Sequence, residues 1–482
     1  MPKREISQFE QQRQEKLSRI RELGIDPYGG RYEGAEQAGD IKAGFKEGDE
    51  SQQARCAGRI VLLRDIGKLI FMTLRDWSGT IQIGLSKKLL GDGWPLVKLF
   101  ELGDIIGAAG RLGKTQTGEI TIWADSVTLL SKSLLPPPEK FHGLSDIDLR
   151  YRQRYVDLWA NPEVMERFKR RSSIIATIRE FLMSRGFMEV ETPMMQREVG
   201  GAAARPFVTH HNSLDMELFL RIAPELFLKR LLVGGMEKVF EINRNFRNEG
   251  LSRAHNPEFT MLELYQAYAD YNVMMDLTEE LICLLVAKYC GGGHVQFGDV
   301  TINYSKPWRR ATYAELLKEH GGCDIDDIKS VRAKAAKLGL DERNMDDAVV
   351  VNGVFESTVE EKLVLPTFVM DYPSALCPLT RRKKDEPRYA ERFELYIGGM
   401  ELANAYTELN DPAVQEENFK IQLRGQEETM AKMDTDFVTA LKYGMPPAGG
   451  LGIGIDRLVM VLTGAASIRD VVLFPLLRPV PE

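Results

Sequence analysis

The N-terminal third of the chain alternates short apolar runs with polar turns, a pattern that predicts β-strands. Strand-like runs cover residues 60–63, 69–74, 81–85, 104–112 and 119–130, and a short helical pattern over 94–102 follows the third run. The polar segment 1–48 carries apolar residues among charges over 6–25, which predicts an N-terminal extension with one exposed helix ending near Gly24.

Three strands, a helix and two strands are the order of a five-stranded OB-fold β-barrel, which we expect over residues 49–138. One face of such a barrel binds single-stranded nucleic acid. The stretch Pro136-Pro137-Pro138 then predicts a domain boundary, because consecutive prolines continue neither a strand nor a helix.

Residues 139–482 mix long helical patterns with strand patterns. Helices are expected over 161–186, 224–234 and 261–289, and strands over 218–222, 238–246, 369–372, 392–397 and 400–407. Strands joined by hairpin-like turns and interrupted by long helices predict an α+β domain with a mainly antiparallel sheet flanked by helices. Within it, residues 307–365 look like an insertion, with a helical run over 330–338.

Composition narrows the class of protein. The 482 residues are 44% hydrophobic, which excludes disorder as the dominant state. No stretch approaches the roughly 18 consecutive apolar residues of a membrane span, and residues 1–16 lack the apolar core of an export signal. The five cysteines are widely spaced without a Cys-x-x-Cys pair, which suits a reducing compartment and offers no zinc pattern. We therefore expect a soluble, cytoplasmic protein with no membrane partner.

The net charge of −7 taken alone argues against a nucleic-acid partner, because neutralising phosphates needs lysine and arginine. The charge is unevenly distributed, however. Residues 51–135 hold 11 basic and 7 acidic side chains, so that this segment is +4 and the remainder is −11. The predicted barrel therefore remains compatible with RNA.

The densest polar constellation is the segment 246–259, Phe-Arg-Asn-Glu-Gly-Leu-Ser-Arg-Ala-His-Asn-Pro-Glu-Phe. At the end of a strand, Arg247 and Glu249 would share one face, since strand side chains alternate. Arginine can fork onto a carboxylate or phosphate, and glutamate can accept from an exocyclic amine. Taken alone, the pair fits a surface ion pair better.

Glycines alternate within 449–458, Gly-Gly-Leu-Gly-Ile-Gly-Ile-Asp-Arg-Leu, ahead of the amphipathic stretch 459–462. They would leave one strand face bare for a flat ligand or another backbone, and Arg457 would lie near the next helix N-terminus, where anions are favoured. Tight packing of a helix on the sheet explains the glycines equally well.

The segment 392–411 predicts a hairpin turned at Gly398-Gly399. Glu394 and Glu401 would lie on its adjacent strands and could converge on a divalent metal, typically Mg²⁺ shared with phosphates. Polar alternation on a solvated sheet face is the alternative. By period two, one face of the second strand carries Asn404, Tyr406 and Glu408.

These three segments, in this order, give the chain a close resemblance to the bacterial class II lysyl-tRNA synthetases, whose subclass also contains the aspartyl and asparaginyl enzymes. The resemblance covers nearly the whole chain: 186–193 resembles the first class II motif, 246–259 the second and 452–457 the third. It implies activation of L-lysine with ATP and Mg²⁺ to lysyl-adenylate, transfer of lysine to its tRNA, and a homodimer with Pro193 at the interface.

The resemblance also assigns the adenylate-forming residues. Arg247 would bridge the substrate carboxylate and the α-phosphate, Arg457 would reach the γ-phosphate, and charge stabilisation by such groups dominates phosphoryl transfer. Glu394 and Glu401 would hold Mg²⁺. Phe259 would stack on the adenine, with the other contacts to ATP made by Glu249, His255 and Asn256.

Lysine carries two ammonium groups, and burying either one unpaired would be costly. The resemblance assigns Glu225 to the α-ammonium with Gly201 beside it, although Pro224-Glu225 also fits an ordinary helix start. It assigns Glu408 and Tyr265 to the ε-ammonium. The same pocket would be lined by Glu263, Asn404 and Tyr406. An aspartate-specific relative would instead need a cation in place of Glu408.

On the barrel, the resemblance implies that a uridine-rich anticodon is contacted by Arg64, Phe71, Gln82 and Glu119. A strand aromatic can stack on an unpaired base, and Gln or Glu can address Watson–Crick edges. Phe71 could instead point into the barrel core.

The chain departs from the family pattern at three positions: Ala254 stands where many relatives have arginine, Cys377 where serine is usual, and Tyr406 where phenylalanine is common. A phosphate contact at 254 is therefore in doubt. The alternatives are a catalytically altered synthetase-like tRNA-binding protein, an aspartyl- or asparaginyl-type synthetase, or an OB-fold binder with an unrelated C-terminal domain. The last would leave the third motif unexplained.

Overall fold

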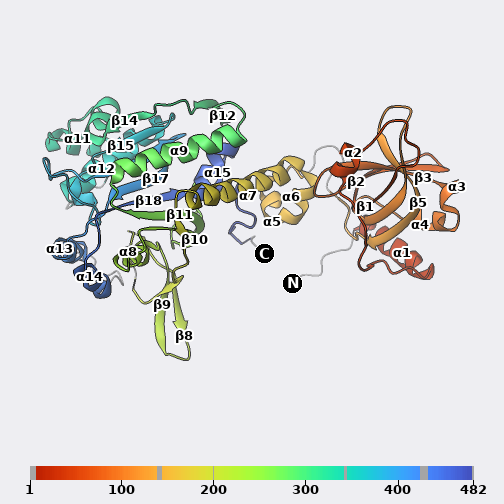
Figure 1. Ribbon diagram of the computed structural model, residues 1–482, viewed down its shortest axis with the longest axis horizontal. Helices are drawn as coiled ribbons and strands as arrows, with labels where there is room; N and C mark the ends of the chain where they lie inside the picture. Colours follow the sequence, from red (N-terminus) through yellow and green to blue (C-terminus); the bar gives the residue numbers. More distant parts are fainter. Residues whose placement is uncertain are drawn as a thin grey trace. The chain divides into compact units, whose positions relative to one another are not determined.

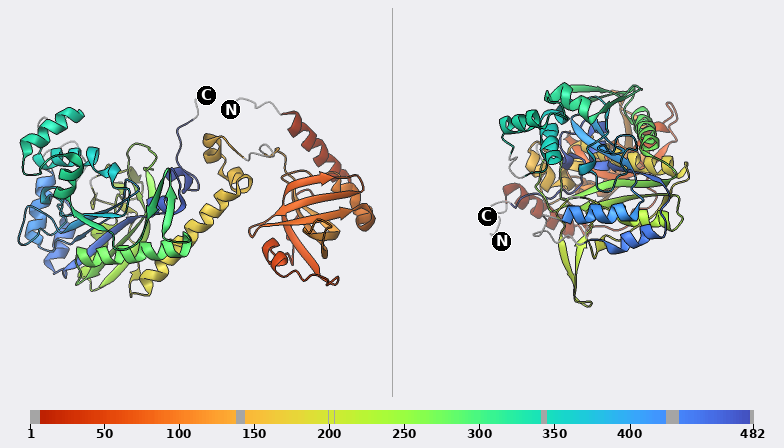
Figure 2. Two further views of the ribbon diagram at one scale, coloured as in Figure 1. Left: turned by 90° about the horizontal axis from the view of Figure 1, so that it is seen from above. Right: turned by 90° about the vertical axis from the view of Figure 1, so that its left-hand side faces the viewer.

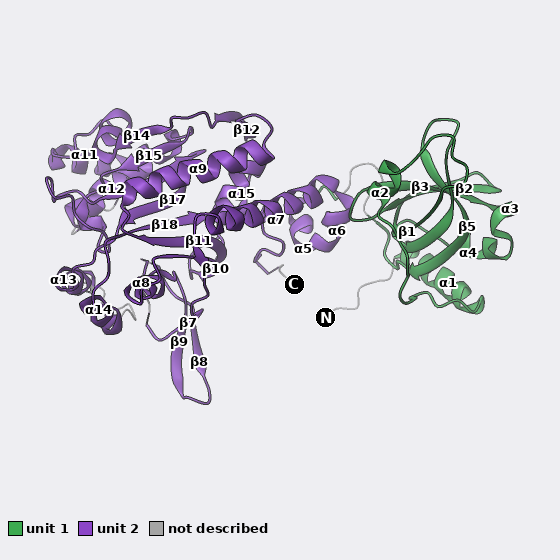
Figure 3. Cartoon of the chain, viewed as in Figure 1, with its two compact units in different colours: residues 1–145 green, residues 146–482 purple. Residues whose placement is uncertain are grey.

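The computed structural model describes residues 7–137, 144–198, 200–202, 204–340, 345–423 and 433–479. The chain divides into two compact units, Met1–Ser145 and Asp146–Glu482 (Figure 3). The predicted boundary after residue 138 lies outside the described residues and stays a prediction. Among the residues described, we find no helix with the length and apolar character needed to cross a membrane.

The first unit contains a closed barrel with the strand order β1-β2-β3-β5-β4 (Figure 1). All its neighbouring strands are antiparallel except β3 and β5, which run parallel. The predicted OB-fold barrel is confirmed. Its strands are β1 (Gln53–Asp65), β2 (Leu69–Arg75), β3 (Thr80–Ser86), β4 (Ile105–Lys114) and β5 (Ile120–Ser131).

Helices accompany this barrel. They are α1 (Gln8–Glu22), α2 (Ala38–Ala43), α3 (Lys87–Leu90), the 3-10 turn η1 (Gly91–Gly93) and α4 (Trp94–Val97). Helix α1 corresponds to the N-terminal helix that the sequence predicts, and it starts where Ser7 accepts a hydrogen bond from the Glu10 amide. The helix expected over 94–102 already ends at Val97.

The second unit is built on an eight-stranded sheet in the order β14-β15-β16-β17-β18-β11-β10-β6. Only the pairs at its two edges, β14–β15 and β10–β6, are parallel, so the predicted mainly antiparallel α+β fold is confirmed. Its strands are β6 (Met188–Glu189), β10 (Lys238–Phe246), β11 (Glu258–Ala267), β14 (Arg309–Thr312), β15 (Thr367–Met370), β16 (Arg392–Ile397), β17 (Met400–Thr407) and β18 (Ala448–Gly454).

Two smaller sheets complete the strands of this unit. One contains β7 (Met195–Gln196), β8 (Val208–His211) and β9 (Met216–Leu220), and the other β12 (His294–Phe297) and β13 (Val300–Asn303). The α-helices are α5 (Ile147–Arg152), α6 (Arg154–Ala160), α7 (Pro162–Met183), α8 (Glu225–Val233), α9 (Tyr271–Tyr289), α10 (Tyr313–Leu316), α11 (Ile328–Leu338), α12 (Asp347–Thr358), α13 (Pro412–Leu423), α14 (Thr435–Lys442) and α15 (Ile455–Thr463). The other short helical segments are the π-helix η2 (Leu317–Gly321) and the 3-10 helices η3 (Glu360–Lys362), η4 (Ser374–Leu376) and η5 (Ile468–Asp470).

One face of the large sheet forms the main hydrophobic core with helices α7, α9 and α15 (Figure 2). Alternate strand residues such as Leu262, Leu264, Leu451, Ile453 and Phe393 point into this core and are fully or almost fully buried. The residues between them therefore project from the opposite face, away from these helices.

The helix predicted over 261–289 is wrong in its first part. Residues up to Ala267 belong to strand β11, and the helix α9 begins only at Tyr271, after Asp270 caps it. The apolar residues in 261–267 also fit a helical period, but β11 pairs along its length with β10 and β18. As a result Glu263 and Tyr265 lie on a strand and share one face.

The segment 307–365, which the sequence predicts to be an insertion, begins with a strand of the large sheet. Strand β14 pairs with β15 at the sheet edge, and the helices that follow pack around a separate core that includes Tyr313, Val331, Val354 and Phe355. Part of this segment is thus anchored to the large sheet.

Candidate active site

Polar residues and glycines alternate on the face of the sheet opposite the main core. Strand register aligns Tyr265, Gly450 and Tyr406 across β11, β18 and β17. The next row aligns Glu263, Gly452, Asn404 and Glu394 across these strands and β16. The period-two pattern seen in the sequence therefore builds one continuous polar floor.

The glycines of β18 serve both purposes that the sequence left open. A Cβ atom at Gly450 would lie 2.0 Å from Glu408 Oε1 and 2.6 Å from the Tyr265 ring, so a side chain there would displace both. A Cβ at Gly449 would lie 2.9 Å from the Asp270 carbonyl oxygen, where α9 begins. Gly450 thus leaves room for polar groups, whereas Gly449 permits close packing of the helix.

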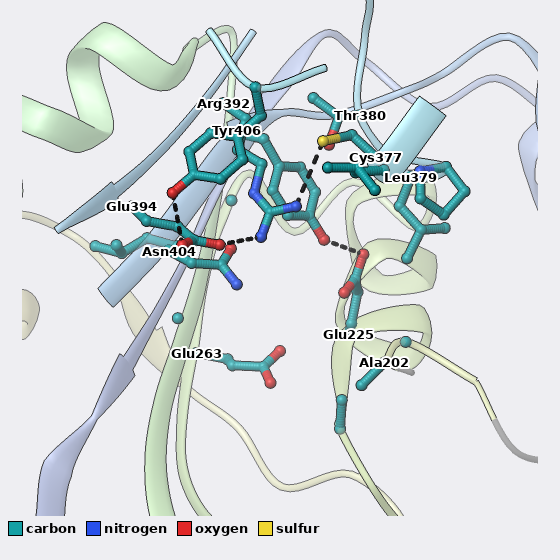
Figure 4. A pocket seen from close by; sticks show the side chains of 18 of the residues that line it. Ala202, Glu225, Glu263, Cys377, Leu379, Thr380, Arg392, Glu394, Asn404 and Tyr406 are labelled. Carbon is teal, nitrogen blue, oxygen red and sulfur yellow. Dashed lines mark hydrogen bonds and ion pairs between the residues drawn. The ribbon is translucent and has the colours of Figure 1, made fainter. Parts of the chain in front are cut away.

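A cavity of about 550 Å³ opens above this floor (Figure 4). Residues on the four strands β11, β16, β17 and β18, on α8 and in the loop at Gly201 converge on it, and most of the predicted lysine-pocket residues line it. They are Gly201, Glu225, Glu263, Tyr265, Asn404 and Tyr406. Glu408 does not line this cavity, but its carboxylate lies against Gly450, which does.

A buried charge cluster links helix α8 to the end of β17. The Nζ atom of Lys229 donates to Glu225 Oε1 at 2.7 Å and forms an ion pair with Glu408. The Tyr406 hydroxyl donates to the same Glu225 oxygen at 2.5 Å. Glu225 and Lys229 are one helical turn apart, so the helix presents both to the sheet. A phenylalanine at 406, which is common in the family, would lack this hydroxyl. The tyrosine of this chain therefore makes a hydrogen bond that phenylalanine cannot make.

Burial in the cavity destabilises ionised carboxylates. It raises the pKa of Glu263 to about 8, and repulsion from Glu225 adds to the effect. The Tyr265 hydroxyl donates to Glu263 Oε2 at 3.1 Å, which partly opposes the rise. Burial likewise raises the pKa of Glu408, although the Lys229 ammonium opposes it. In the free pocket at neutral pH, Glu263 therefore retains a proton.

A second cavity of about 250 Å³ adjoins the first. It is lined by the predicted ATP-site residues of the second and third motifs, namely Arg247, Glu249, His255, Asn256, Phe259 and Arg457. The two cavities share lining residues, which are Arg247, Met261, Glu401, Asn404 and Gly452. Arg247 is thus the cation common to both spaces.

The arginines of the second cavity are held by specific contacts. The guanidinium of Arg247 lies 5.1 Å from the centre of the Phe259 ring, and burial lowers the pKa of Arg247 while Glu401 and Glu249 oppose this. Arg457 donates to the Glu401 carbonyl oxygen at 2.7 Å and lies 3.0 Å from His255 Nε2. Burial and the nearby Arg457 both lower the pKa of His255, so its neutral ring can accept from Arg457.

Helix α15, which carries Arg457, is fixed to the second motif by Asp456. This carboxylate accepts from the Thr260 amide at 2.7 Å and pairs with Arg171 of α7 at 2.6 Å. Arg171 in turn donates to the Thr260 hydroxyl. The network sets the position of the third-motif arginine relative to β11.

Glu394 and Glu401 both line the larger cavity. Glu394 accepts from the hydroxyls of Tyr372 at 2.7 Å and Tyr396 at 2.8 Å, and it pairs with Arg392. Burial raises the pKa of Glu394; Arg392 opposes this and Glu401 adds to it. Among the residues that can be described, no three acidic, histidine or cysteine side chains are grouped to hold a metal by themselves. Two carboxylates fit a Mg²⁺ ion whose remaining ligands are phosphates and water.

The predicted anticodon residues lie on the outer face of the barrel. Ile70, Met72 and Leu74 of β2 are buried, so the half-buried Phe71 between them points outward and not into the core. Register places Arg64 opposite Phe71, and Gln82 is on the neighbouring strand β3. Glu119 precedes β5 and pairs with Lys42 of α2 at 3.2 Å.

Sequence reasoning missed an aromatic partner on this face. Trp123 of β5 makes an edge contact with Phe71, with ring centres 5.8 Å apart. A Cβ at Gly84 would lie 2.6 Å from the Trp123 ring, so the glycine makes room for it. The alternation of β5 marks Trp123 as outward-facing, but only strand register reveals the pair.

Sequence reasoning also missed Lys229 and Arg392. The spacing of four between Glu225 and Lys229 was a visible signal, whereas the contact of Lys229 with Glu408 is tertiary. At the departure position 377, the Cys377 sulfur accepts from Arg392 at 3.4 Å. Ala254 lines the smaller cavity, and Arg253 beside it is exposed and does not.

Pro193, the predicted interface residue, is exposed at the start of a surface stretch that contains Met194 and Met195. Further exposed apolar side chains of this region are Met188, Val208 and Leu214.

Comparison with known proteins agrees with the two units. Residues 146–478 match the family model described as "tRNA synthetases class II (D, K and N)", and residues 54–130 match that of the OB-fold nucleic acid binding domain. A lysine–tRNA ligase of Carboxydothermus hydrogenoformans is 54% identical over 99% of this chain and 100% of that protein. The corresponding proteins of Pelotomaculum thermopropionicum and Moorella thermoacetica are 53% and 51% identical, each over 98% of this chain and 96% and 98% of their own lengths.

Proposed function

The chain belongs to the lysine–tRNA ligases of the class II tRNA synthetases, and from this premise we propose how its own residues perform the reaction. The observation that carries the proposal is the pair of adjoining cavities with Arg247 common to both. A cation at that junction can hold the lysine carboxylate and the α-phosphate of ATP together, so that the carboxylate attacks the phosphorus and pyrophosphate leaves.

ATP occupies the smaller cavity. Phe259 stacks on the adenine, Glu249 accepts from the amino group of the base, and Asn256 and His255 complete the contacts. Arg457 binds the γ-phosphate. Because the His255 ring beside it is neutral, it does not cancel the charge of the Arg457 guanidinium, which can still donate to a phosphate oxygen. These arginines stabilise the charge that develops on the phosphates.

Lysine occupies the larger cavity. Glu225 and Gly201 receive its α-ammonium, Glu408 and Tyr265 receive the ε-ammonium, and Glu263, Asn404 and Tyr406 complete the walls. Glu408 supports this assignment, because its buried Oε1 atom has no hydrogen-bond partner in the described parts of the chain, while Oε2 is paired with Lys229. Such an acceptor is costly unless a ligand donor satisfies it.

Glu394 and Glu401 would hold Mg²⁺, which supplies neutralisation of phosphate charge when bound. The barrel binds the anticodon of the lysine tRNA through Arg64, Phe71, Gln82 and Glu119. Phe71 stacks on a base, since it faces outward beside Trp123.

Two copies form a homodimer around Pro193, a proposal supported by the exposed apolar residues Met188, Met194 and Met195 near it. We place the enzyme in the cytoplasm. All five cysteines are free thiols, as expected in a reducing compartment.

The test of amino-acid activation is the exchange of labelled pyrophosphate into ATP in the presence of magnesium. Lysine should stimulate this exchange, whereas aspartate and asparagine should not. Exchange driven by aspartate or asparagine but not by lysine would overturn the assignment of the larger cavity.

A further inference from the structure

Three carboxylates lie in or directly behind the walls of the space assigned to lysine, one more than its two ammonium groups require. They are Glu225, Glu263 and Glu408, and they are 5%, 5% and 1% exposed. The carboxylate of the substrate is itself negative and is paired with Arg247. It therefore leaves the third negative charge of the pocket unpaired. A pocket at this depth cannot leave that charge unpaired without a large cost.

Lys229 supplies the missing positive charge from within the fold. Its side chain is fully buried, and its ammonium contacts both Glu225 and Glu408, whose assigned ligands are the two ends of the substrate. Although burial alone would lower it, the pKa of Lys229 is raised by Glu225 and Glu408, so the side chain is charged at neutral pH.

We propose that Lys229 is an internal counter-cation: in the lysine complex, where all three carboxylates are ionised, it brings the pocket to a net charge of −2, which the two substrate ammonium groups neutralise. The inference rests on the proposed lysine site and deepens it. Lys229 is a positioning and specificity residue: it does not line the cavity, and it acts through the two carboxylates that it holds.

The charged and titratable groups around Lys229 support this balance. On its own helix, Lys229 contacts Glu225. Tyr406 of β17 and Glu408, which follows that strand, also lie against Lys229. Glu263 and Tyr265 of β11 interact in turn with Glu408. Helix α14 packs on it through the uncharged ring of Phe437. Arg230, the next residue of α8, forms ion pairs with Asp434 and Asp436 instead.

The test neutralises Lys229 and measures KM for lysine and for ATP in the full-length enzyme by pyrophosphate exchange. In Lys229→Met we expect KM for lysine at pH 7 to rise about tenfold or more, which corresponds to loss of one buried charge contact, with KM for ATP within about twofold. Lys229→Gln keeps a hydrogen-bond donor but not the charge, so it should behave like Lys229→Met. It also replaces that variant if Lys229→Met does not fold. Arg230→Gln, which neutralises the adjacent cation, should leave KM for lysine within about twofold of the parent.

A second-site variant distinguishes charge balance from a merely structural role. Glu263→Gln alone should weaken lysine binding, because the pocket of the complex then carries −1 against two ammonium groups. In the double variant Lys229→Met/Glu263→Gln the pocket returns to −2, and KM for lysine should fall below that of Lys229→Met. Losses that simply add, or KM values for lysine and ATP that rise together, would overturn the inference. If the parent enzyme shows no lysine-dependent exchange, the proposed function itself fails.

Discussion

Gly450→Ala should selectively damage lysine binding. The new methyl group would lie 2.0 Å from Glu408 Oε1 and 2.6 Å from the Tyr265 ring. Neither group can withdraw easily, because Glu408 is 1% exposed and tied to Lys229, and Tyr265 is 3% exposed. Overpacking of this kind costs about 1–3 kcal/mol. Since each 1.4 kcal/mol is tenfold, KM for lysine should rise roughly 5- to 150-fold.

The assay is pyrophosphate exchange with lysine and ATP varied in turn. Gly454→Ala, in the same strand, provides the control for KM of lysine, because its nearest neighbours would be 3.7 Å from the added carbon atom. KM for ATP should change little in Gly450→Ala. An unchanged KM for lysine, or an equal rise for both substrates, would refute the position assigned to the ε-ammonium.

Three further predictions concern protons, charge and RNA. Below pH 8 the free enzyme holds a proton on Glu263, and a bound ammonium favours the carboxylate, so lysine binding should release a proton and tighten as pH rises towards 8. Calorimetry in buffers of different ionisation enthalpy measures this release, which should be smaller in Glu263→Gln than in the parent; proton uptake would contradict the assignment. Glu408→Gln should raise KM for lysine at least about tenfold while changing KM for ATP little, and equal lysine affinity in variant and parent would contradict its role. Phe71→Ala should raise KM for tRNA about 5- to 150-fold in charging assays, from a stacking loss of about 1–3 kcal/mol, without altering pyrophosphate exchange. A simultaneous loss of exchange would point to misfolding instead.

Strong local patterns predicted much of the fold. Strands β10, β16 and β17 coincide with the expected ranges, because their alternation is clear and glycines or polar loops end them. The first residues of the expected helix 261–289 are a strand instead, since pairing with β10 and β18 decides a segment whose apolar spacing fits both structures. Helix α9 emerges only where Asp270 can cap it.

Sequence patterns placed candidate residues on shared faces, but they did not reveal the tertiary contacts between those residues. Period two gave the shared face of Asn404 and Tyr406, and strand register aligned them with the glycines of β18. The ion pair of Lys229 with Glu408 joins residues far apart in the chain, so no local pattern could show it. The same is true of Phe71 and Trp123, which meet only when β2, β3 and β5 lie in register.

Charging of tRNA with labelled lysine is the most direct test of the central claim, because it requires both units of the chain and both half-reactions. With ATP and magnesium, the enzyme should attach lysine, and neither aspartate nor asparagine, to its tRNA. Activation of lysine without transfer to tRNA, or transfer of another amino acid in its place, would contradict the account.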